Sequence, residues 1–373
     1  MTRGIKLFTL FNIQIALDYS WFIVFALFGW SLSYGYFPHY APGFDKTTYL
    51  ALGFSSAFLI FVCVLIHELS HSLVSNSLGH KVKRITLFIF GGIAEMTREP
   101  DTASVELKIA VAGPIASALL AAIFYTLAKL AATPDPSATE ALLTYLGLVN
   151  TMLCIFNLIP GFPLDGGRIL RALWWGYTGN IDSATRAASR IGVGFALILI
   201  VLGFMQIFSG NIVGGLWAVL IGFFIQRAAE GGYRQLQYQQ ALSGVLVREL
   251  MSSTVVSIPG ELKLERAIEQ YFLVHHHVSF PVIVDGKPVG LITLGHIRSL
   301  GHGQWSNTTV REAMDPLTSV TVLTPETKVI DAVGMISRGT LGRAVVIKEG
   351  RVVGMLSRGD IMRLLELKTV LKE

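Results

Sequence analysis

The chain has 373 residues, of which 52% are hydrophobic and 15% are charged, and its net charge is +5. A soluble domain averages about 25% charged residues, so this composition excludes an ordinary soluble protein and predicts an integral membrane protein. The positive charges gather at the ends of apolar runs, which favours a role in topology over nucleic-acid binding. The two cysteines, Cys63 and Cys154, fall in apolar stretches and indicate no disulfide framework.

Residues 5–17 carry the first pattern in the chain. Apolar and polar side chains alternate there, as in Asn12-Ile13-Gln14-Ile15, which predicts a strand at the membrane edge. An apolar run follows at 19–38, with the aromatic ends that anchor spans at the interface. A second apolar run covers 48–77. A bilayer core takes roughly 20 helical residues, so both runs are predicted to be membrane spans.

The second predicted span contains a His-Glu-x-x-His motif, formed by His67, Glu68 and His71. Residues i and i+4 share one face of a helix, so the two imidazoles can be directed at one cation. Glu68 can then take a proton from a water held there. The alternative is a chance match, but ionisable residues within a span are costly and are functional by default. Hydrolytic zinc sites usually have three protein ligands, so another segment should supply the third.

A short β-rich segment at 85–96 is centred on Phe90, Gly91 and Gly92. It is too short and too broken for a span, and it predicts a hairpin. Non-helical backbone at membrane depth must be covered by protein. We therefore expect a re-entrant hairpin packed on the metal site, with a hydrophobic surface hairpin as the alternative.

The third and fourth spans are predicted at 104–131 and 141–159, and the fourth runs into an irregular segment at 157–168. Two prolines and three glycines are expected to unwind the chain there. Asp165 is the candidate third ligand, although a short acidic side chain can also cap the following helix. Asn157 can hydrogen-bond a substrate carbonyl or tie the unwound turn.

Two further spans are predicted at 189–208 and 211–227, and basic residues indicate the topology. With the N-terminus inside, the outer loops hold only Lys46. We therefore expect both termini in the cytoplasm and the metal toward the cytoplasmic side of the cell membrane. The inner segments then carry Arg3, Lys6, Lys81, Lys83, Arg84, Arg98, Lys108, Arg168, Arg171, Arg186, Arg190, Arg227 and Arg234.

After about residue 230 the composition becomes that of a soluble domain. A linker at 231–244 precedes two similar units, in which the segment that starts at Val247 reappears at Val310. Each unit has a strand–turn–strand–helix pattern, so the region is an internal repeat of about 63 residues.

The first 230 residues resemble the site-2 protease family of intramembrane zinc metalloproteases. The resemblance rests on the His67–His71 motif, Phe90-Gly91-Gly92, Ala112-Gly113-Pro114 and the segment 157–168. It implies one zinc ion per chain bound by His67, His71 and Asp165, with Glu68 as base. It also implies that Asn157 positions the substrate and that hairpin 85–96, with Phe90, Gly91 and Gly92, pairs with an extended substrate. Substrates would be transmembrane proteins cut by regulated intramembrane proteolysis.

Residues 245–366 resemble a tandem CBS pair, a module that often binds adenine nucleotides and commonly dimerises. Its nucleotide signature is complete in the second unit, where Ser357 and Asp360 occupy the polar positions. The first unit has His296 where the signature has Asp. The resemblance implies a nucleotide at the second unit and a homodimer, while the alternative for Asp360 is a helix cap.

We thus expect a multi-pass α-helical membrane protein, with about six transmembrane helices and a small membrane-associated β-hairpin, followed by a soluble α/β CBS pair. The expected domains are 1–230, 231–244 as linker, 245–305 and 306–373. Two other functions are open: a CBS-gated transporter or channel, and a non-catalytic membrane scaffold. A transporter would need broken helices in two matching halves, whereas the sequence has one broken stretch, and Glu68 favours an enzyme.

Overall fold

The computed structural model describes residues 4–89, 91–133, 137–339 and 341–370. The chain divides into two compact units between Arg234 and Gln235. Within the described residues, six helical segments are long and apolar enough to cross a membrane, as predicted. They are Tyr19–Tyr40, Lys46–Ser77, Ala103–Leu130, Ala138–Asn157, Ile181–Phe208 and Ile212–Leu242.

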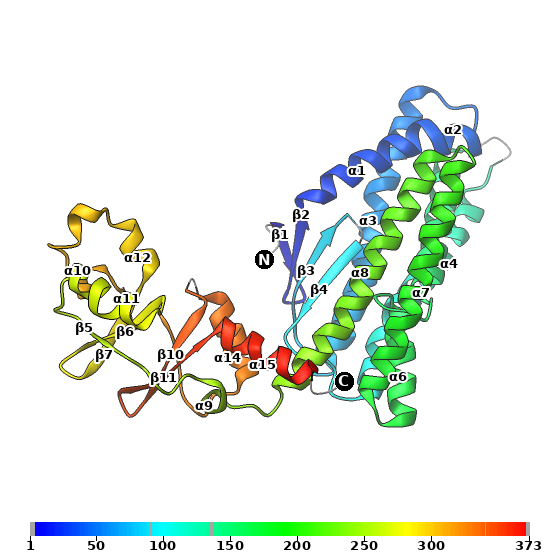
Figure 1. The fold of residues 1–373 in the computed structure, drawn as a ribbon. Coiled ribbons are helices and arrows are strands. Elements are labelled where there is room, and N and C mark those ends of the chain that lie inside the picture. The colour runs from blue at the N-terminus through cyan, green and yellow to red at the C-terminus, as the bar shows by residue number, and fades with distance from the viewer. Residues whose placement is uncertain (1–3, 90, 134–136, 340, 371–373) are drawn as a thin grey trace. The chain divides into compact units, whose positions relative to one another are not determined.

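The first segment combines α1 (Tyr19–Ser31), a π-helical turn (Leu32–Tyr36) and α2 (Phe37–Tyr40). Figure 1 shows how the helices of this unit are arranged. A shorter helix, α6 (Asp165–Thr178), follows the irregular segment and is not among the six. The remaining spans are α3 (Lys46–Ser77), α4 (Ala103–Leu130), α5 (Ala138–Asn157), α7 (Ile181–Phe208) and α8 (Ile212–Leu242).

Two helices are longer than the sequence predicts. Helix α7 begins at Ile181 rather than at 189, and α8 continues to Leu242 rather than ending at 227. Most of the expected linker 231–244 is therefore the last part of α8. Gln is the commonest residue of that segment, and together with Leu, Arg and Ala it favours helix even where the chain is polar.

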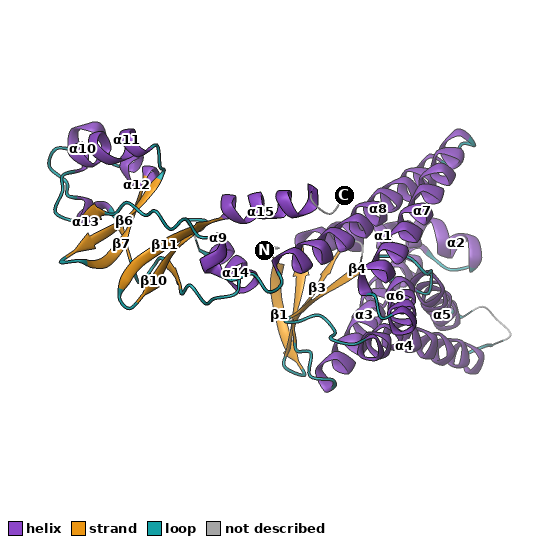
Figure 2. Ribbon diagram, turned by 60° about the horizontal axis from the view of Figure 1, so that its bottom comes forward, coloured by secondary structure: helices purple, strands orange, loops and turns teal. Residues whose placement is uncertain are grey.

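A four-stranded sheet lies along the helices of the first unit (Figure 2). Its order is β1 (Gly4–Leu10), β2 (Ile13–Asp18), β3 (Val82–Phe88) and β4 (Gly91–Met96). The first and last pairs are antiparallel hairpins, and β2 runs parallel to β3. The predicted hairpin at 85–96 is present, with β4 at the edge of the sheet. The single strand expected within 5–17 is instead a hairpin, which turns at Phe11 and Asn12 in the left-handed region.

The core of this sheet packs against the helix that carries the motif. Ile13, Ile15 and Ile85 are fully buried and form one cluster with Trp21 of α1 and Phe61 of α3. This packing fixes β3, and through its hairpin β4, against α3.

The second unit contains two small sheets, as expected for a repeated α/β module. One has the order β5-β6-β7-β8 and the other β11-β10-β9. In each repeat a short parallel strand precedes a helical segment, an antiparallel hairpin and a closing helix. The first repeat comprises β5 (Ile258–Pro259), α10 (Leu264–Ala267), a π-helical turn (Ile268–Phe272), α11 (Leu273–His275), β6 (Ser279–Val284), β7 (Lys287–Thr293), α12 (Leu294–Ser299) and a 3-10 turn (His302–Gln304). The second comprises β9 (Thr321–Leu323), α14 (Val329–Arg338), β10 (Arg343–Lys348), β11 (Arg351–Ser357) and α15 (Arg358–Val370).

The opening segment of each repeat packs with the other repeat. Val247, in α9 (Val247–Leu250), is fully buried in the core of the second repeat, and its N–H donates to Thr327 O at 2.8 Å. Val310, in α13 (Val310–Ala313), is buried in the core of the first repeat. The next strand, β8 (Asp315–Pro316), also joins the first sheet. The two repeats are thus interlocked and form one unit.

Candidate metal centre

Two imidazoles project from one face of α3. His67 and His71 are one helical turn apart, both are buried, and their Nε2 atoms lie 3.3 Å from each other. The motif therefore has the one-sided arrangement that its spacing predicts.

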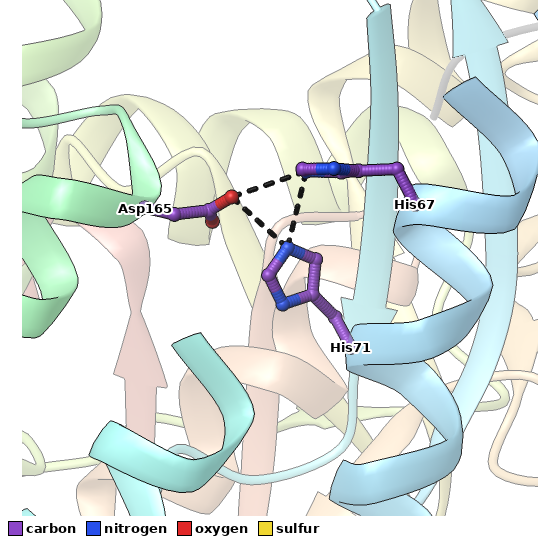
Figure 3. Close-up of side chains that lie close together, drawn as sticks. All are labelled: His67, His71 and Asp165. Carbon is purple, nitrogen blue, oxygen red and sulfur yellow. Dashed lines mark hydrogen bonds and ion pairs between the residues drawn. The ribbon is translucent and has the colours of Figure 1, made fainter. Parts of the chain in front are cut away.

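Asp165 meets this pair from α6. Its Oδ2 atom lies 3.1 Å from Nε2 of His67 and 3.1 Å from Nε2 of His71. Figure 3 shows the two imidazoles and the carboxylate converging on one point. The N-cap of α6 is Leu164, and Asp165 is the first residue of the helix. Its side chain faces the imidazoles, so the capping alternative does not describe its position.

The outer hydrogen bond of His71 directs a lone pair of this ring at the centre. Nδ1 of His71 lies 2.7 Å from the carbonyl oxygen of Ile109, which can only accept, so this nitrogen carries the proton. In the neutral ring, Nε2 of His71 is then an acceptor, and it faces the acceptor oxygen of Asp165. Two acceptor atoms, Nε2 of His71 and Oδ2 of Asp165, therefore face each other with no proton between them, an arrangement that a bound cation would stabilise.

The donor spacing is within a few tenths of an ångström of that in a tetrahedral zinc site. Zinc bonds to nitrogen and oxygen of about 2.0–2.2 Å in a tetrahedron place neighbouring donors roughly 3.3–3.6 Å apart. The three donor pairs here are separated by 3.1, 3.1 and 3.3 Å. Two nitrogens and one carboxylate oxygen are also a donor set of hydrolytic zinc sites, which keep a fourth position open.

Helix α4 supports both imidazoles from the other side. Nδ1 of His67 lies 2.9 Å from Oγ of Ser117, which is fully buried. Between Ser117 and Ile109 lies Gly113, where a Cβ atom would stand 2.1 Å from Nε2 of His71. A residue with a side chain therefore cannot replace Gly113 without displacing the imidazoles.

The position of Asp165 depends on close backbone packing after α5. The N–H of Phe162 donates to Ala188 O on α7 at 3.1 Å. Gly166 and Gly167, which the sequence suggested would unwind the chain, lie instead in the first turn of α6. A Cβ atom at Gly167 would stand 2.4 Å from backbone atoms of the preceding loop, so the absence of a side chain allows α6 to start there.

A cavity of about 600 Å³ opens beside the three side chains. Glu68 lines it next to His67 and His71, and a Cβ atom at Gly92 of β4 would stand 2.4 Å from Glu68 Cγ. The edge strand of the sheet therefore lies directly against this carboxylate. Asp165, Asn157, Arg168, Gly91 and Trp217 are also among the lining residues.

The other predicted site residues include Asn157, Gly91 and Phe90. Asn157 ends α5 and lines the cavity, and its amide donates to Leu153 O at 3.0 Å, so it ties its own helix turn as well. Gly91 begins β4 with φ +133°, a conformation that favours glycine. Phe90 lies outside the described residues.

Both parts of the chain match family models. Residues 55–135 and 126–201 match peptidase family M50, and residues 247–303 and 307–367 match the CBS domain. Over 371 residues the chain is 34% identical to zinc metalloprotease Rip3 of Mycobacterium tuberculosis, a match that covers 98% of this chain and 94% of that protein. The chain belongs to peptidase family M50.

Other members of family M50 are also similar. A zinc metalloprotease of Methanocaldococcus jannaschii is 31% identical over 84% of this chain and 87% of its own length. The solved site-2 protease from M. jannaschii is 32% identical, with a TM-score of 0.42, covering 62% of this chain and 95% of that one. By its family and its named relatives, the chain is a site-2-type zinc metalloprotease with two CBS domains, and zinc is the metal that the family implies. The transporter and scaffold alternatives lose their support.

In this M50 peptidase, the residues that hydrogen-bond the outer nitrogens of the two imidazoles were not predicted from the sequence. Ser117 and Ile109 are not motif residues, and a backbone carbonyl leaves no signal in a sequence. The i, i+4, i+8 spacing of Ile109, Gly113 and Ser117 on α4 is visible, but its meaning requires knowing that α4 packs on α3. Cys63 is buried and lies outside the cluster of His67, His71 and Asp165 among the described residues.

The polar signature residues of the CBS pair have different surroundings in the two repeats. In the second, Oδ2 of Asp360 accepts from Ser357 N–H at 2.9 Å and from its hydroxyl at 2.7 Å. Arg343, which contacts the Ser279 hydroxyl, is nearby: burial lowers the pKa of its guanidinium, and the charge of Asp360 partly offsets this. In the first, Nε2 of His296 lies 3.2 Å from Oδ2 of Asp315.

Proposed function

We propose that the protein is an intramembrane zinc endopeptidase that hydrolyses peptide bonds in or beside transmembrane segments of other proteins. The observation that supports this most directly is the convergence of His67, His71 and Asp165 beside Glu68 in one cavity. One zinc ion per chain would be held by the two Nε2 atoms and Oδ2 of Asp165. When bound, zinc would supply a Lewis acid that polarises the scissile carbonyl and acidifies water.

Glu68 would act as general base and then as general acid. It is on the same helix as the two imidazoles and lines the same cavity, where its carboxylate could bind a water. It would accept a proton from the attacking water and pass it to the leaving amide nitrogen. Without this transfer the amine would have to leave as an anion, so loss of Glu68 should cost orders of magnitude in rate.

Strand β4 would hold the substrate. A helical substrate hides its carbonyls in its own hydrogen bonds, so it must unwind before hydrolysis, and unwound backbone in lipid needs new partners. Strand β4 is the edge of its sheet and lies against Glu68, so an extended peptide could be added to it there. Gly91 and Gly92 would form this strip, with Asn157 binding a substrate carbonyl across the cavity.

The setting would be the cytoplasmic membrane, with both termini in the cytoplasm. The basic residues of the loops support this orientation through their one-sided distribution. The partners would be transmembrane protein substrates and the lipid around them, in regulated intramembrane proteolysis.

The CBS pair would bind an adenine nucleotide at its second repeat and regulate cleavage, with a homodimer formed through this region. Asp360 has an oxygen, Oδ1, that is not used by Ser357 and can accept from a ribose hydroxyl, and Arg343 supplies positive charge nearby. The first repeat has His296 in place of the carboxylate, and that histidine pairs with Asp315.

The test is cleavage of a single-span model substrate by purified wild-type protein and by Glu68→Gln, in detergent and in proteoliposomes. Wild type should cut the substrate within or beside its span. Glu68→Gln should retain about one zinc per chain and show no cleavage. Cleavage by this variant at the wild-type rate would refute the role of Glu68.

A further inference from the structure

Glu106 is a fully buried carboxylate in the first turn of α4, inside a helix that is apolar enough to span a membrane. Its Oε1 atom accepts from Nε of Arg171 at 2.7 Å and also contacts Nη2 of the same guanidinium. Nε of Arg168 lies 3.9 Å from that oxygen. Both arginines are on α6, so the ion cluster joins α4 to the helix that begins with Asp165.

Arg171 also contacts the loop that leads into α6. Its guanidinium lies over the ring of Phe162, 5.0 Å from the centroid. Phe162 is itself buried, and its backbone is fixed to α7 through the hydrogen bond to Ala188 O. Arg171 is therefore held between a carboxylate on one side and an aromatic ring on the other.

The ligand and both arginines share one face of α6. Asp165, Arg168 and Arg171 follow each other at intervals of three residues, and residues three apart are neighbours on a helix surface. A rotation or shift of α6 that moved the arginines away from Glu106 would also move the Asp165 carboxylate relative to the imidazoles.

Helix α4 contacts both of the helices that carry the three ligands. The Ser117 hydroxyl hydrogen-bonds Nδ1 of His67, and the carbonyl oxygen of Ile109 accepts from Nδ1 of His71. Glu106 of the same helix binds Arg171 of α6. The distance between the histidine pair on α3 and Asp165 on α6 is thus set through a third helix that contributes no ligand. Two nitrogens of the planar Arg171 guanidinium contact the one oxygen Oε1, so the contact restricts the direction of the guanidinium as well as its distance.

We propose that Glu106 is a positioning residue of the metal centre. Through Arg171 it holds α6 at the rotation that brings Asp165 to the two imidazoles. It also keeps Arg168, which lines the cavity with Glu68, turned toward α4. The role rests on the proposed function, since it concerns the zinc ligands named there. A buried charge in a span is costly, and geometric control of a ligand is a function that such a pair can serve.

Zinc affinity tests this role separately from stability. The affinity of the apoprotein for zinc is measured by competition with a chromogenic chelator, alongside thermal unfolding, for wild type and four variants. Glu106→Leu leaves Arg171 buried without its carboxylate, and Glu106→Leu/Arg171→Met removes both charges. Arg171→Lys keeps the charge but loses the planar fork. Arg186→Gln is the matched control, because Arg186 pairs with Asp182 on the exposed surface of α7.

Glu106→Leu should lower both the unfolding temperature and the zinc affinity, the latter by about 10–100-fold, as for other residues that orient metal ligands. The double variant should recover the unfolding temperature but not the zinc affinity. Arg171→Lys should fold normally and bind zinc more weakly than wild type, and Arg186→Gln should match wild type in both measurements.

Wild-type zinc affinity in the double variant or in Arg171→Lys would overturn the proposal, because the pair would then only stabilise the fold. If Glu106→Leu does not fold, the zinc affinities of the double variant and of Arg171→Lys test the proposal. A wild-type protein that binds no zinc would instead refute the proposed function.

Discussion

Gly92 of β4 lies against Glu68 of α3 so closely that a Cβ atom at position 92 would stand 2.4 Å from Glu68 Cγ. The edge strand and the proposed base are therefore in direct contact. The strand that would receive the substrate also limits where the carboxylate can lie. If β4 binds the substrate and Glu68 is the base, substrate binding and proton transfer would be coupled through this glycine.

Gly92→Ala should displace Glu68 or β4 without touching a zinc ligand. A shift of about 1 Å at a reacting group can cost about 100-fold in rate, so we expect cleavage to fall by 10–100-fold while zinc content stays at about one per chain. The measurement is the cleavage rate at saturating substrate together with zinc analysis. Gly194→Ala on α7 is the control, because no described atom outside its own stretch of helix lies within 4 Å of the position of its added Cβ. Full activity in Gly92→Ala would show that the contact is unimportant.

Ser117→Ala should weaken zinc binding although Ser117 is not a ligand. It removes the partner of His67 Nδ1, which orients the ring. The expected loss in zinc affinity is about 10–100-fold, measured by chelator competition. Ser56→Ala on α3 is the matched control, since the Ser56 hydroxyl is equally buried and has no hydrogen-bond partner among the described residues. Equal affinities in the two variants would remove Ser117 from the metal centre.

Asp360→Asn should abolish nucleotide binding by the CBS pair. The variant keeps the shape of the side chain, but it loses the negative charge that strengthens the bond from a ribose hydroxyl and one of the two acceptor oxygens, of which Oδ2 is bonded by Ser357. Calorimetric titration of the full-length protein with AMP and ATP should give heat for wild type and none for Asp360→Asn. Asp285→Asn is the control, because Asp285 is exposed in the β6–β7 turn, where Asn tolerates its φ of 49°. Absence of heat with both nucleotides for wild type would count against nucleotide binding itself.

Much of this protein could be predicted from local patterns. Apolar runs predicted six spans because lipid demands long uninterrupted helices. The i, i+4 spacing placed His67 and His71 on one face, and the need for a third ligand led to Asp165, 94 residues beyond His71, which the structure brings within 3.1 Å of it. These predictions depend on helix geometry and on coordination chemistry, both of which are local or general.

Other features depend on packing that no local pattern encodes. Arg168 and Arg171 were counted as topology charges near a span end, yet they face a buried carboxylate on another helix. Strand β1 was missed because its apolar side chains are exposed on both faces and do not alternate. The polar end of α8 looked like a linker because residues 233–240 are rich in Gln and Tyr, although Gln favours helix.

The central claim is that one zinc ion is held by His67, His71 and Asp165. Its most direct test is the zinc content of purified wild-type protein, Glu68→Gln and Asp165→Ala, measured by atomic emission after identical dialysis. We predict about one zinc per chain for wild type and for Glu68→Gln, and a large loss for Asp165→Ala. A wild-type protein free of transition metal, or an Asp165→Ala variant with unchanged zinc content, would contradict it.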